Sequence, residues 1–245
     1  MGFLALIAAL AVAASSNSGN PAVEAFRTSV PLPQIQPKPP PDPIKGPSFP
    51  IAQVRPGHRI TLHASPGGRV IARVDDRGEF GPARFFWIHK VRGGWLGVPT
   101  PELPNGQLGW IRDDRFALDI TQTHFWITAD ISDRELELRY GDRILDRFPV
   151  SVGSPGSPTP PGDYAVTDGL VGRGLGPWYG CCVLALSGHQ PNLPPGWIGG
   201  DRIAIHGTNS AIGAANSSGC LRASDSDMVS LFARVPLGAP VFIRA

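Results

Sequence analysis

Short runs of alternating apolar and polar residues dominate the chain from residue 51 to about residue 118. Glycine or proline separates each run from the next. Alternation over so few residues is typical of half-buried β-strands, and the separating residues favour tight turns, as at residues 65–68 and 92–94. We therefore predict a small barrel of antiparallel strands. Its runs are residues 58–62, 69–74, 84–88, 95–98 and 109–111.

A second set of apolar runs occupies residues 121–245 and predicts further short strands. Glycine and proline separate most of these runs, as in the hairpin turn at residues 139–143 and the proline-stiffened turn at residues 159–164. The runs are residues 124–128, 135–140, 147–152, 183–187, 202–206 and 240–243. We expect these residues to form a second, mostly β domain.

One helix is predicted near the end of this second domain. Ser224, followed three residues later by Asp227, is a capping-box type of helix start. Met228, Leu231 and Phe232 then fall on one face, at the spacing of an amphipathic helix. A proline follows soon after this face, so the helix is expected to be short.

The first 50 residues follow neither pattern. Residues 3–14 are apolar throughout; as a helix they rise about 18 Å, too little to cross a hydrocarbon core of roughly 30 Å. Such a stretch is typical of a secretory signal peptide, cleaved or retained as a weak anchor, although no Lys or Arg precedes it. Nine prolines between residues 31 and 50 favour an extended spacer. The predicted order is a signal peptide over 1–20, a linker over 21–50, and domains over 51–118 and 121–245.

The charge balance argues against a nucleic-acid-binding protein. The chain has 22 basic and 20 acidic side chains, a formal net charge of +2, and no basic run. Neutralising phosphates requires a basic surface, which this composition does not supply. The sequence also lacks a glycine-rich phosphate loop, a dinucleotide fingerprint and metal-ligand spacing. We therefore expect no nucleic acid, nucleotide, metal or other cofactor.

Two short segments of the second domain carry candidate chemistry. His206 ends a predicted strand, and fourteen residues later Cys220 follows a Ser-Ser-Gly turn. A free thiol is only a few per cent ionised at neutral pH, and an adjacent imidazole can take its proton and hold the thiolate as an ion pair. A glycine before the cysteine lets successive N–H groups form an oxyanion hole. The pattern indicates acyl transfer; the alternative is a buried thiol and an unrelated histidine.

The two segments resemble the motif of the L,D-transpeptidases of the YkuD family, a His-Gly pair followed by Ser/Thr-x-Gly-Cys-hydrophobic-Arg. The matching residues are His206, Gly207, Ser217, Gly219, Cys220, Leu221 and Arg222. Further similar segments are residues 159–164, 176–179, 184–188, 205–209, 212–213, 225–232 and 237–243. Ser218 departs from the family, because many members have histidine there. An imidazole contribution at this position is therefore lost, and His206 is the favoured candidate base.

The first domain has a resemblance of its own. Its sequence WLGV, a loop and then GWI is similar to bacterial SH3-like domains of cell-wall proteins. Together the resemblances imply a mainly β protein, with a small SH3-like β-barrel followed by a YkuD-type β-sandwich catalytic domain with one short helix. Trp87, Trp95 and Trp110 either line a binding groove in the first domain or pack in its core.

The resemblance implies a two-step acyl transfer on peptidoglycan stem peptides. Cys220 would attack the third-residue diamino acid of a tetrapeptide donor and release D-alanine. An amine of a neighbouring stem would then accept the acyl group and form a 3→3 cross-link. Attack by water would instead make the protein an L,D-carboxypeptidase, and a third alternative is a non-catalytic wall-binding protein. We expect an exported monomer of the periplasm or cell wall, in which carbapenems acylate Cys220.

The resemblance also assigns residue roles. His206 is the expected base, oriented by Gly207 or Thr208. The expected oxyanion-hole donors are the N–H groups of Ser218, Gly219 and Cys220. The expected substrate-binding residues are Trp178, Tyr179, Thr208, Asn209, Ser217 and Arg222. Arg222 either pins the cysteine turn or meets a substrate carboxylate.

Several side chains have no assigned role. Cys181 and Cys182 are either two packed thiols or a disulfide between adjacent residues. A bridge from either to Cys220 is the least expected pairing, because it would abolish activity, although an oxidising compartment permits it. The other five histidines are expected to be surface or packing residues, with His189 the closest of them to the cleft.

Overall fold

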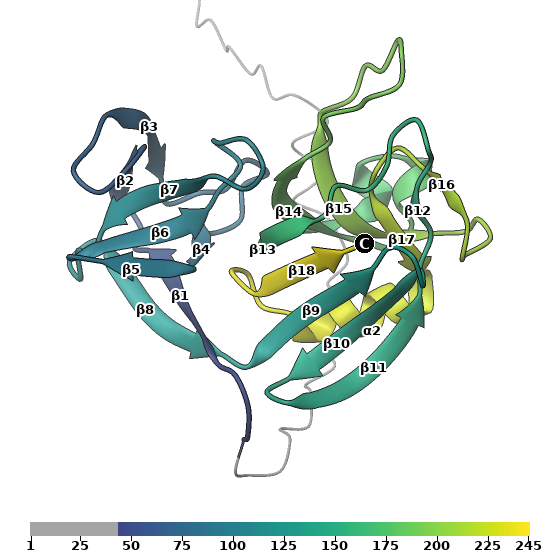
Figure 1. Ribbon diagram of the computed structural model, residues 1–245, viewed down its shortest axis with the longest axis horizontal. Helices are drawn as coiled ribbons and strands as arrows, with labels where there is room; N and C mark the ends of the chain where they lie inside the picture. Colours follow the sequence, from purple (N-terminus) through teal and green to yellow (C-terminus); the bar gives the residue numbers. More distant parts are fainter. Residues whose placement is uncertain (1–43) are drawn as a thin grey trace, which may run out of the picture. The chain divides into compact units, whose positions relative to one another are not determined.

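The computed structural model describes residues 44–245, which lie within one compact unit. The predicted signal peptide and most of the predicted linker lie outside these residues. None of the helices formed by residues 44–245 is long and apolar enough to cross a membrane. The chain is mainly β, as the sequence predicts (Figure 1).

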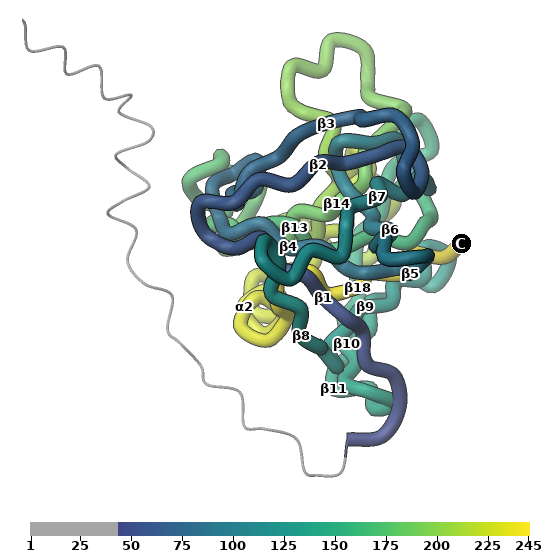
Figure 2. The backbone as a smooth tube through the Cα atoms, turned by 90° about the vertical axis from the view of Figure 1, so that its left-hand side faces the viewer, coloured from purple at the N-terminus to yellow at the C-terminus, as the bar shows by residue number. Residues whose placement is uncertain are grey.

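Residues 49–123, the N-terminal β-domain, form two sheets around one core. The first has the order β3-β2-β7-β6-β5 and the second the order β4-β1-β8. The strands are β1 (Phe49–Val54), β2 (Arg59–His63), β3 (Val70–Asp75), β4 (Phe85–Trp87), β5 (Lys90–Arg92), β6 (Trp95–Pro99), β7 (Leu108–Arg112) and β8 (Leu118–Thr123). β1 and β8 run antiparallel, side by side (Figure 2). β1 includes Phe49 and Pro50, which the sequence assigns to the linker, and the expected boundary at 118–121 falls within β8.

The three tryptophans of this domain pack against other side chains. Trp87 is buried, and its ring lies edge-on to Phe242 of the following domain, with ring centroids 5.4 Å apart. The guanidinium of Arg112 lies 4.9 Å above the ring of Trp95. Trp110 is half-buried and lies over Gly97. None of the three lines either cavity described below, which favours the packing interpretation over the groove.

Residues 125–244, the C-terminal domain, contain one eight-stranded sheet with the order β11-β10-β9-β18-β13-β14-β15-β17. The strands of this domain are β9 (Phe125–Asp130), β10 (Glu135–Tyr140), β11 (Arg143–Pro149), β12 (Val152–Gly153), β13 (Gly162–Val171), β14 (Cys182–His189), β15 (Arg202–Thr208), β16 (Ala215–Ser217), β17 (Leu221–Ser224) and β18 (Pro240–Arg244). β12 pairs with β16 in a separate two-stranded sheet.

β13 joins the two halves of the large sheet. Residues 162–165 pair with β18, and residues 166–171 pair with β14 after an irregularity in register. The two halves of β13 therefore take different partners, so that this strand joins β11-β10-β9-β18 to β14-β15-β17. The sequence could not predict this, since it shows where strands begin but not which partner each half of a strand takes.

α2 (Asp225–Arg234) begins where the capping pattern predicts. The Ser224 hydroxyl accepts a hydrogen bond from the Asp227 N–H at 3.1 Å. Met228 and Leu231 are fully buried, and Phe232 lies against Gly169 of β13. α2 packs on β14, β15 and β17, and so covers the sheet face to which Gly169 belongs.

Loss of this cap is expected to destabilise the fold. Ser224→Ala leaves the Asp227 N–H without its side-chain acceptor and should lower the free energy of unfolding by about 1 kcal/mol. Urea denaturation monitored by circular dichroism measures the difference. Ser224→Asn, which retains a capping oxygen, is the matched control and should stay close to wild type. Equal losses in both variants would contradict the capping role.

Candidate active site

Strand register places His206, Cys220 and Arg222 on the sheet face opposite α2. β15 and β17 run parallel, with His206 beside Arg222 and Ile205 beside Leu221. Because side chains alternate along a strand, His206 and Arg222 share one face, whereas Ile205 and Leu221 point to the other. Cys220 immediately precedes β17, two residues before Arg222, and so emerges on the same side as His206.

A cleft of about 230 Å³ opens on this face. It is lined by Trp178, Tyr179, Gln190, Leu193, Trp197, Gly200, Asp201, Arg202, His206, Ser218, Cys220 and Arg222. The candidate nucleophile and the candidate base therefore share one cavity. At its edge, the side chain of Trp178 is largely exposed and that of Trp197 is partly exposed.

Burial and one hydrogen bond define the state of His206. Its side chain is buried, and Nδ1–H donates to the Gly207 carbonyl oxygen at 2.8 Å. In a neutral imidazole this bond leaves Nε2 as the acceptor nitrogen. Burial lowers the pKa of His206 to about 4; the hydrogen bond to Gly207 opposes the shift, and the positive charge of Arg222 adds to it. His206 is therefore a neutral base at physiological pH.

Cys220 is a free thiol and is equally neutral at rest. Burial raises its pKa, although a backbone hydrogen bond with Ala204 and the charge of Arg222 oppose that shift. The side chain packs on the apolar cluster formed by Leu170, Val183 and Ala204. A raised thiol pKa beside a lowered imidazole pKa favours a neutral pair over the expected thiolate–imidazolium pair. The sequence could not show this, because both shifts arise from tertiary burial.

The turn before Cys220 is fixed by Ser217. The buried Ser217 hydroxyl accepts from the Gly219 N–H at 3.1 Å and donates to the Cys220 carbonyl oxygen at 2.6 Å. The Gly219 N–H is therefore already occupied, although the sequence assigns it to the oxyanion hole. Within residues 44–245, the N–H groups of Ser218 and Cys220 have no hydrogen-bond partner.

Gln190, which was not predicted as a site residue, lies against this turn. Its side-chain amide Nε2 is 2.9 Å from the Pro158 carbonyl oxygen, 3.2 Å from that of Ser157 and 3.3 Å from that of Ser218. Gly219, at φ +111°, has no room for a side chain, because a Cβ would lie 1.9 Å from Nε2. A single glutamine after a strand has no recognisable sequence signal, so only the fold reveals it.

The predicted substrate-binding residues divide into two groups. Trp178, Tyr179 and Arg222 line the cleft, and the Tyr179 ring lies 5.0 Å from the His206 ring between centroids. Thr208, Asn209 and Ser217 are not among its lining residues. Nor does Thr208 orient His206: the bond comes from Gly207, and the Thr208 hydroxyl accepts from the Ser210 N–H.

Arg222 carries a charge that the described residues do not neutralise. Its backbone pairs with Ser151 through both N–H and C=O. Its Nε is buried without a hydrogen-bond partner, and no carboxylate of residues 44–245 forms an ion pair with it. Arg222 therefore supports this region through its main chain only, and its guanidinium faces the cleft unpaired.

Cys181 and Cys182 form a disulfide between adjacent residues, one of the two arrangements that the sequence left open. The bridge lies beside the orienting carbonyl of the site. The Cys181 N–H donates to Asp225 Oδ1 at 2.9 Å, and both groups abut Gly207, where a Cβ would meet them. The bridge thus helps to enclose Gly207 while Cys220 stays reduced.

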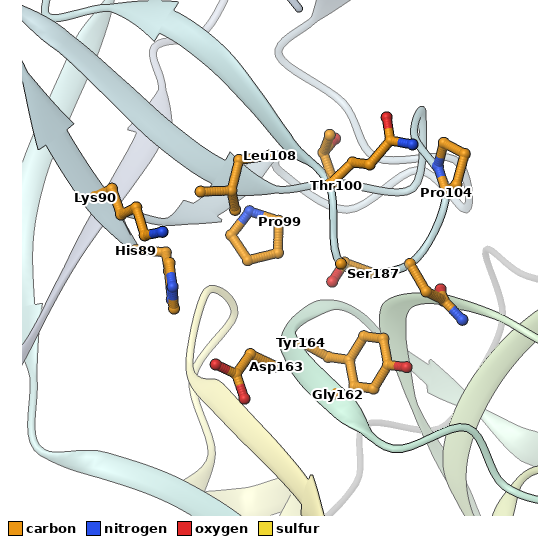
Figure 3. Close-up of a pocket in the computed structure, with 13 residues that line it drawn as sticks. His89, Lys90, Pro99, Thr100, Pro104, Leu108, Gly162, Asp163, Tyr164 and Ser187 are labelled. Carbon is orange, nitrogen blue, oxygen red and sulfur yellow. The ribbon is translucent and has the colours of Figure 1, made fainter. Parts of the chain in front are cut away.

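A second cavity, of about 210 Å³, lies between the two domains (Figure 3). Its labelled lining includes His89, Lys90, Asp163, Tyr164 and Ser187, and Figure 3 shows His89 pointing toward Asp163. No cysteine lines it, and Asp163 is already paired with Arg244 at 2.6 Å. The candidate nucleophile Cys220 and the candidate base His206 both line the first cavity. Among residues 44–245 no cluster of His, Cys, Asp and Glu is arranged to hold a metal ion.

Comparison with known proteins agrees with this geometry. Residues 124–243 match the family model of the YkuD L,D-transpeptidase catalytic domain. The C-terminal domain is therefore similar to the catalytic domain of the YkuD family. The YkuD protein of Bacillus licheniformis is 33% identical over 119 residues, which are 48% of this chain and 64% of the relative. The YkuD protein of Bacillus subtilis is 31% identical over 122 residues, 49% of this chain and 66% of the relative.

The chain thus spans slightly less than two thirds of the length of these YkuD relatives. Among solved structures, Bd1075 of Bdellovibrio bacteriovorus has a TM-score of 0.40 and 24% identity, over 50% of this chain and 48% of that chain. An L,D-transpeptidase from Mycobacterium smegmatis has a TM-score of 0.41 and 14% identity, over 80% of this chain and 99% of that chain. The match to the YkuD model includes both Cys220 and His206, and the likeness of the N-terminal β-domain to SH3-like domains stays a prediction.

Proposed function

We propose that the protein is an exported L,D-transpeptidase that forms 3→3 cross-links between peptidoglycan stem peptides through a thioester on Cys220. One observation carries the proposal: a free thiol and a neutral histidine with an accepting Nε2 line the same cleft of a YkuD domain. A cysteine nucleophile with an adjacent base is the arrangement that acyl transfer requires.

The first step forms the thioester. His206 Nε2 takes the Cys220 proton as the sulfur attacks the carbonyl of the third-residue diamino acid. The N–H groups of Ser218 and Cys220, which are free of other partners among residues 44–245, stabilise the resulting oxyanion. The intermediate then collapses, the peptide C–N bond breaks, and His206 returns the proton to the amine of departing D-alanine.

The second step transfers the acyl group to an amine. The side-chain amine of a neighbouring stem attacks the thioester and gives its proton to His206, so that a new amide forms. The Cys220 thiolate departs and recovers that proton, which restores the resting neutral pair. Neither residue is charged at rest. The Cys220 thiol proton therefore moves to His206 only when the donor is bound, and the amine proton moves only when the acceptor attacks.

Arg222 is proposed to bind a carboxylate of the donor. Its guanidinium lines the cleft without an ion-pair partner among residues 44–245, and stem peptides present carboxylates that it can bind by charge-assisted hydrogen bonds. Trp178 and Tyr179 form the apolar wall beside it. The proposed substrate-binding set is therefore Trp178, Tyr179 and Arg222; Thr208, Asn209 and Ser217 are left out of it.

Purified protein incubated with disaccharide-tetrapeptide is expected to release D-alanine and to form a cross-linked dimer. Mass spectrometry of the products measures both. Tripeptide without dimer would assign the carboxypeptidase reaction to the same site. Neither D-alanine nor dimer, from protein whose Cys220 reacts with a thiol reagent, would contradict the proposed function.

A further inference from the structure

The loop between β14 and β15, residues 190–201, supplies much of the cleft wall. Its lining residues are Gln190, Leu193, Trp197, Gly200 and Asp201. The N-terminal β-domain contacts the chain at both ends of this loop. The contacting residues lie outside the catalytic motif. The shape of this wall therefore depends on residues outside the YkuD domain.

At the start of the loop, Asn105 holds the main chain of His189 from both sides. The His189 N–H donates to Asn105 Oδ1 at 2.8 Å, and Asn105 Nδ2 donates to the His189 carbonyl oxygen at 2.7 Å. The His189 ring adds a third bond, in which Nε2–H donates to the Pro101 carbonyl oxygen at 2.8 Å. His189, predicted to approach the cleft, is thus turned toward the N-terminal β-domain, and its neighbour Gln190 lines the cleft instead.

At the end of the loop, the contact is ionic. Arg202 Nη1 lies 2.6 Å from Glu79 Oε2, and the Arg202 side chain is 8% exposed. Its Nη2 also donates to the Thr167 hydroxyl of β13 at 2.6 Å. The two ends are tied to each other as well, because the Gln190 N–H donates to the Asp201 carbonyl oxygen at 2.6 Å.

The segment that carries Asn105 is itself well anchored. Arg84 forms a half-buried ion pair of 2.8 Å with Glu102, and Glu102 also accepts from the Thr100 hydroxyl. Leu103 is buried against the strand at Gly109. Pro99, Thr100, Pro104 and Leu108 of this segment are labelled in Figure 3, where they bound the cavity between the domains. These contacts therefore hold Asn105 in place for its hydrogen bonds with His189.

We propose that Asn105 of the N-terminal β-domain is a positioning residue for the acyl-transfer reaction. It fixes His189, and through it Gln190, whose amide holds the Ser218 carbonyl and abuts Gly219. The peptide planes of this turn direct the N–H groups proposed for the oxyanion hole. The inference rests on the proposed function, because it assigns a role in the chemistry of Cys220.

Two reactions of the Cys220 thiol, acylation by a carbapenem and alkylation by iodoacetamide, should respond differently to a displaced turn. Opening of a carbapenem ring forms a thioester on Cys220 and breaks the ring C–N bond, with the proton passing to that nitrogen, through a tetrahedral oxyanion. Alkylation by iodoacetamide displaces iodide at a saturated carbon and develops no oxyanion. A displaced turn therefore slows acylation and leaves alkylation unchanged, whereas a general loss of structure changes both.

The test compares the full-length wild type with four variants. Asn105→Leu removes both side-chain hydrogen bonds and keeps the branching of the side chain, and Asn105→Asp keeps the acceptor for the His189 N–H but loses the donor. Gln190→Leu removes the amide at the turn. Gln107→Ala is the matched control, because Gln107 is exposed on the same segment and makes no hydrogen bond to the C-terminal domain. Intact-mass kinetics give the acylation and alkylation rates, and thermal unfolding gives stability.

Asn105→Leu is expected to lower the ratio of acylation to alkylation about 10-fold or more, and Gln190→Leu about 100-fold. Asn105→Asp should fall between wild type and Asn105→Leu, and Gln107→Ala should match wild type within about twofold. An unchanged ratio in Asn105→Leu, with or without a lower Tm, would overturn the positioning role and leave the proposed function intact. Wild type that is alkylated but neither acylated nor able to release D-alanine would overturn both.

Discussion

Cys220→Ser is expected to lower D-alanine release from the tetrapeptide by at least about 1,000-fold. The hydroxyl of serine is a far weaker acid than a thiol, and the nearby neutral imidazole of His206 is a weak base with a pKa of about 4. The side chain is similar in size, so the apolar contacts with Leu170, Val183 and Ala204 persist. Product mass spectrometry measures activity, and an unchanged Tm shows that the fold survives.

The matched control replaces the other two cysteines. The Cys181→Ala/Cys182→Ala double variant removes the disulfide and leaves Cys220 as the remaining thiol. It is expected to form the acyl-enzyme, although the loss of the bridge beside Gly207 slows the reaction. Two results would contradict Cys220 as the nucleophile. One is substantial D-alanine release by Cys220→Ser, and the other is complete inactivity of the Cys181→Ala/Cys182→Ala variant while Cys220→Ser stays active.

His206→Gln is expected to lower kcat/KM by about 100- to 10,000-fold, because the variant lacks a base to take the thiol proton. In wild type, the acid limb of kcat/KM should lie near pH 4, the pKa of the buried imidazole in the free enzyme, and not near 6.5. Rates measured from pH 4 to 8 locate this limb. An acid limb near pH 6.5 would indicate that the base is an exposed histidine elsewhere.

The same pKa affects stability. The folded-state pKa of His206, about 4, lies below the unfolded value of 6.5, so between these values the unfolded chain binds more protons than the folded one. The stability contributed above pH 6.5, about 3 kcal/mol, is lost as the pH falls toward 4. In His206→Gln the loss of unfolding free energy that His206 causes between pH 6.5 and pH 4 should be absent. Urea denaturation at pH 7 and pH 4.5 measures it, and identical pH dependence in both proteins would contradict the burial of a neutral His206.

Local patterns in the sequence predicted the local structure. The Ser224–Asp227 cap and the buried residues Met228 and Leu231 are confirmed in α2. Most of the apolar runs of the C-terminal domain are confirmed as strands, among them β10, β14 and β15, whereas the run 147–152 spans the end of β11 and the start of β12. These features depend on residues a few positions apart, where spacing alone decides which side chains share a face.

The site was predictable only where one strand or turn contains it. The motif predicted Cys220 and His206, and parallel pairing of β15 and β17 brings them to one face. Gln190 and Asn105 escaped prediction because their partners lie 28 and 84 residues away, at separations that no sequence pattern encodes. The neutral state of the Cys220–His206 pair likewise depends on tertiary burial.

The central claim is that Cys220 carries the acyl group between donor and acceptor. The most direct test is to mix the protein with tetrapeptide, quench in acid within the first turnovers, and map the adduct by peptide mass spectrometry. We expect a mass increase equal to the tetrapeptide minus D-alanine on the peptide that contains Cys220, and we expect hydroxylamine to remove it. D-alanine release with no adduct on that peptide, or an adduct elsewhere, would contradict the central claim.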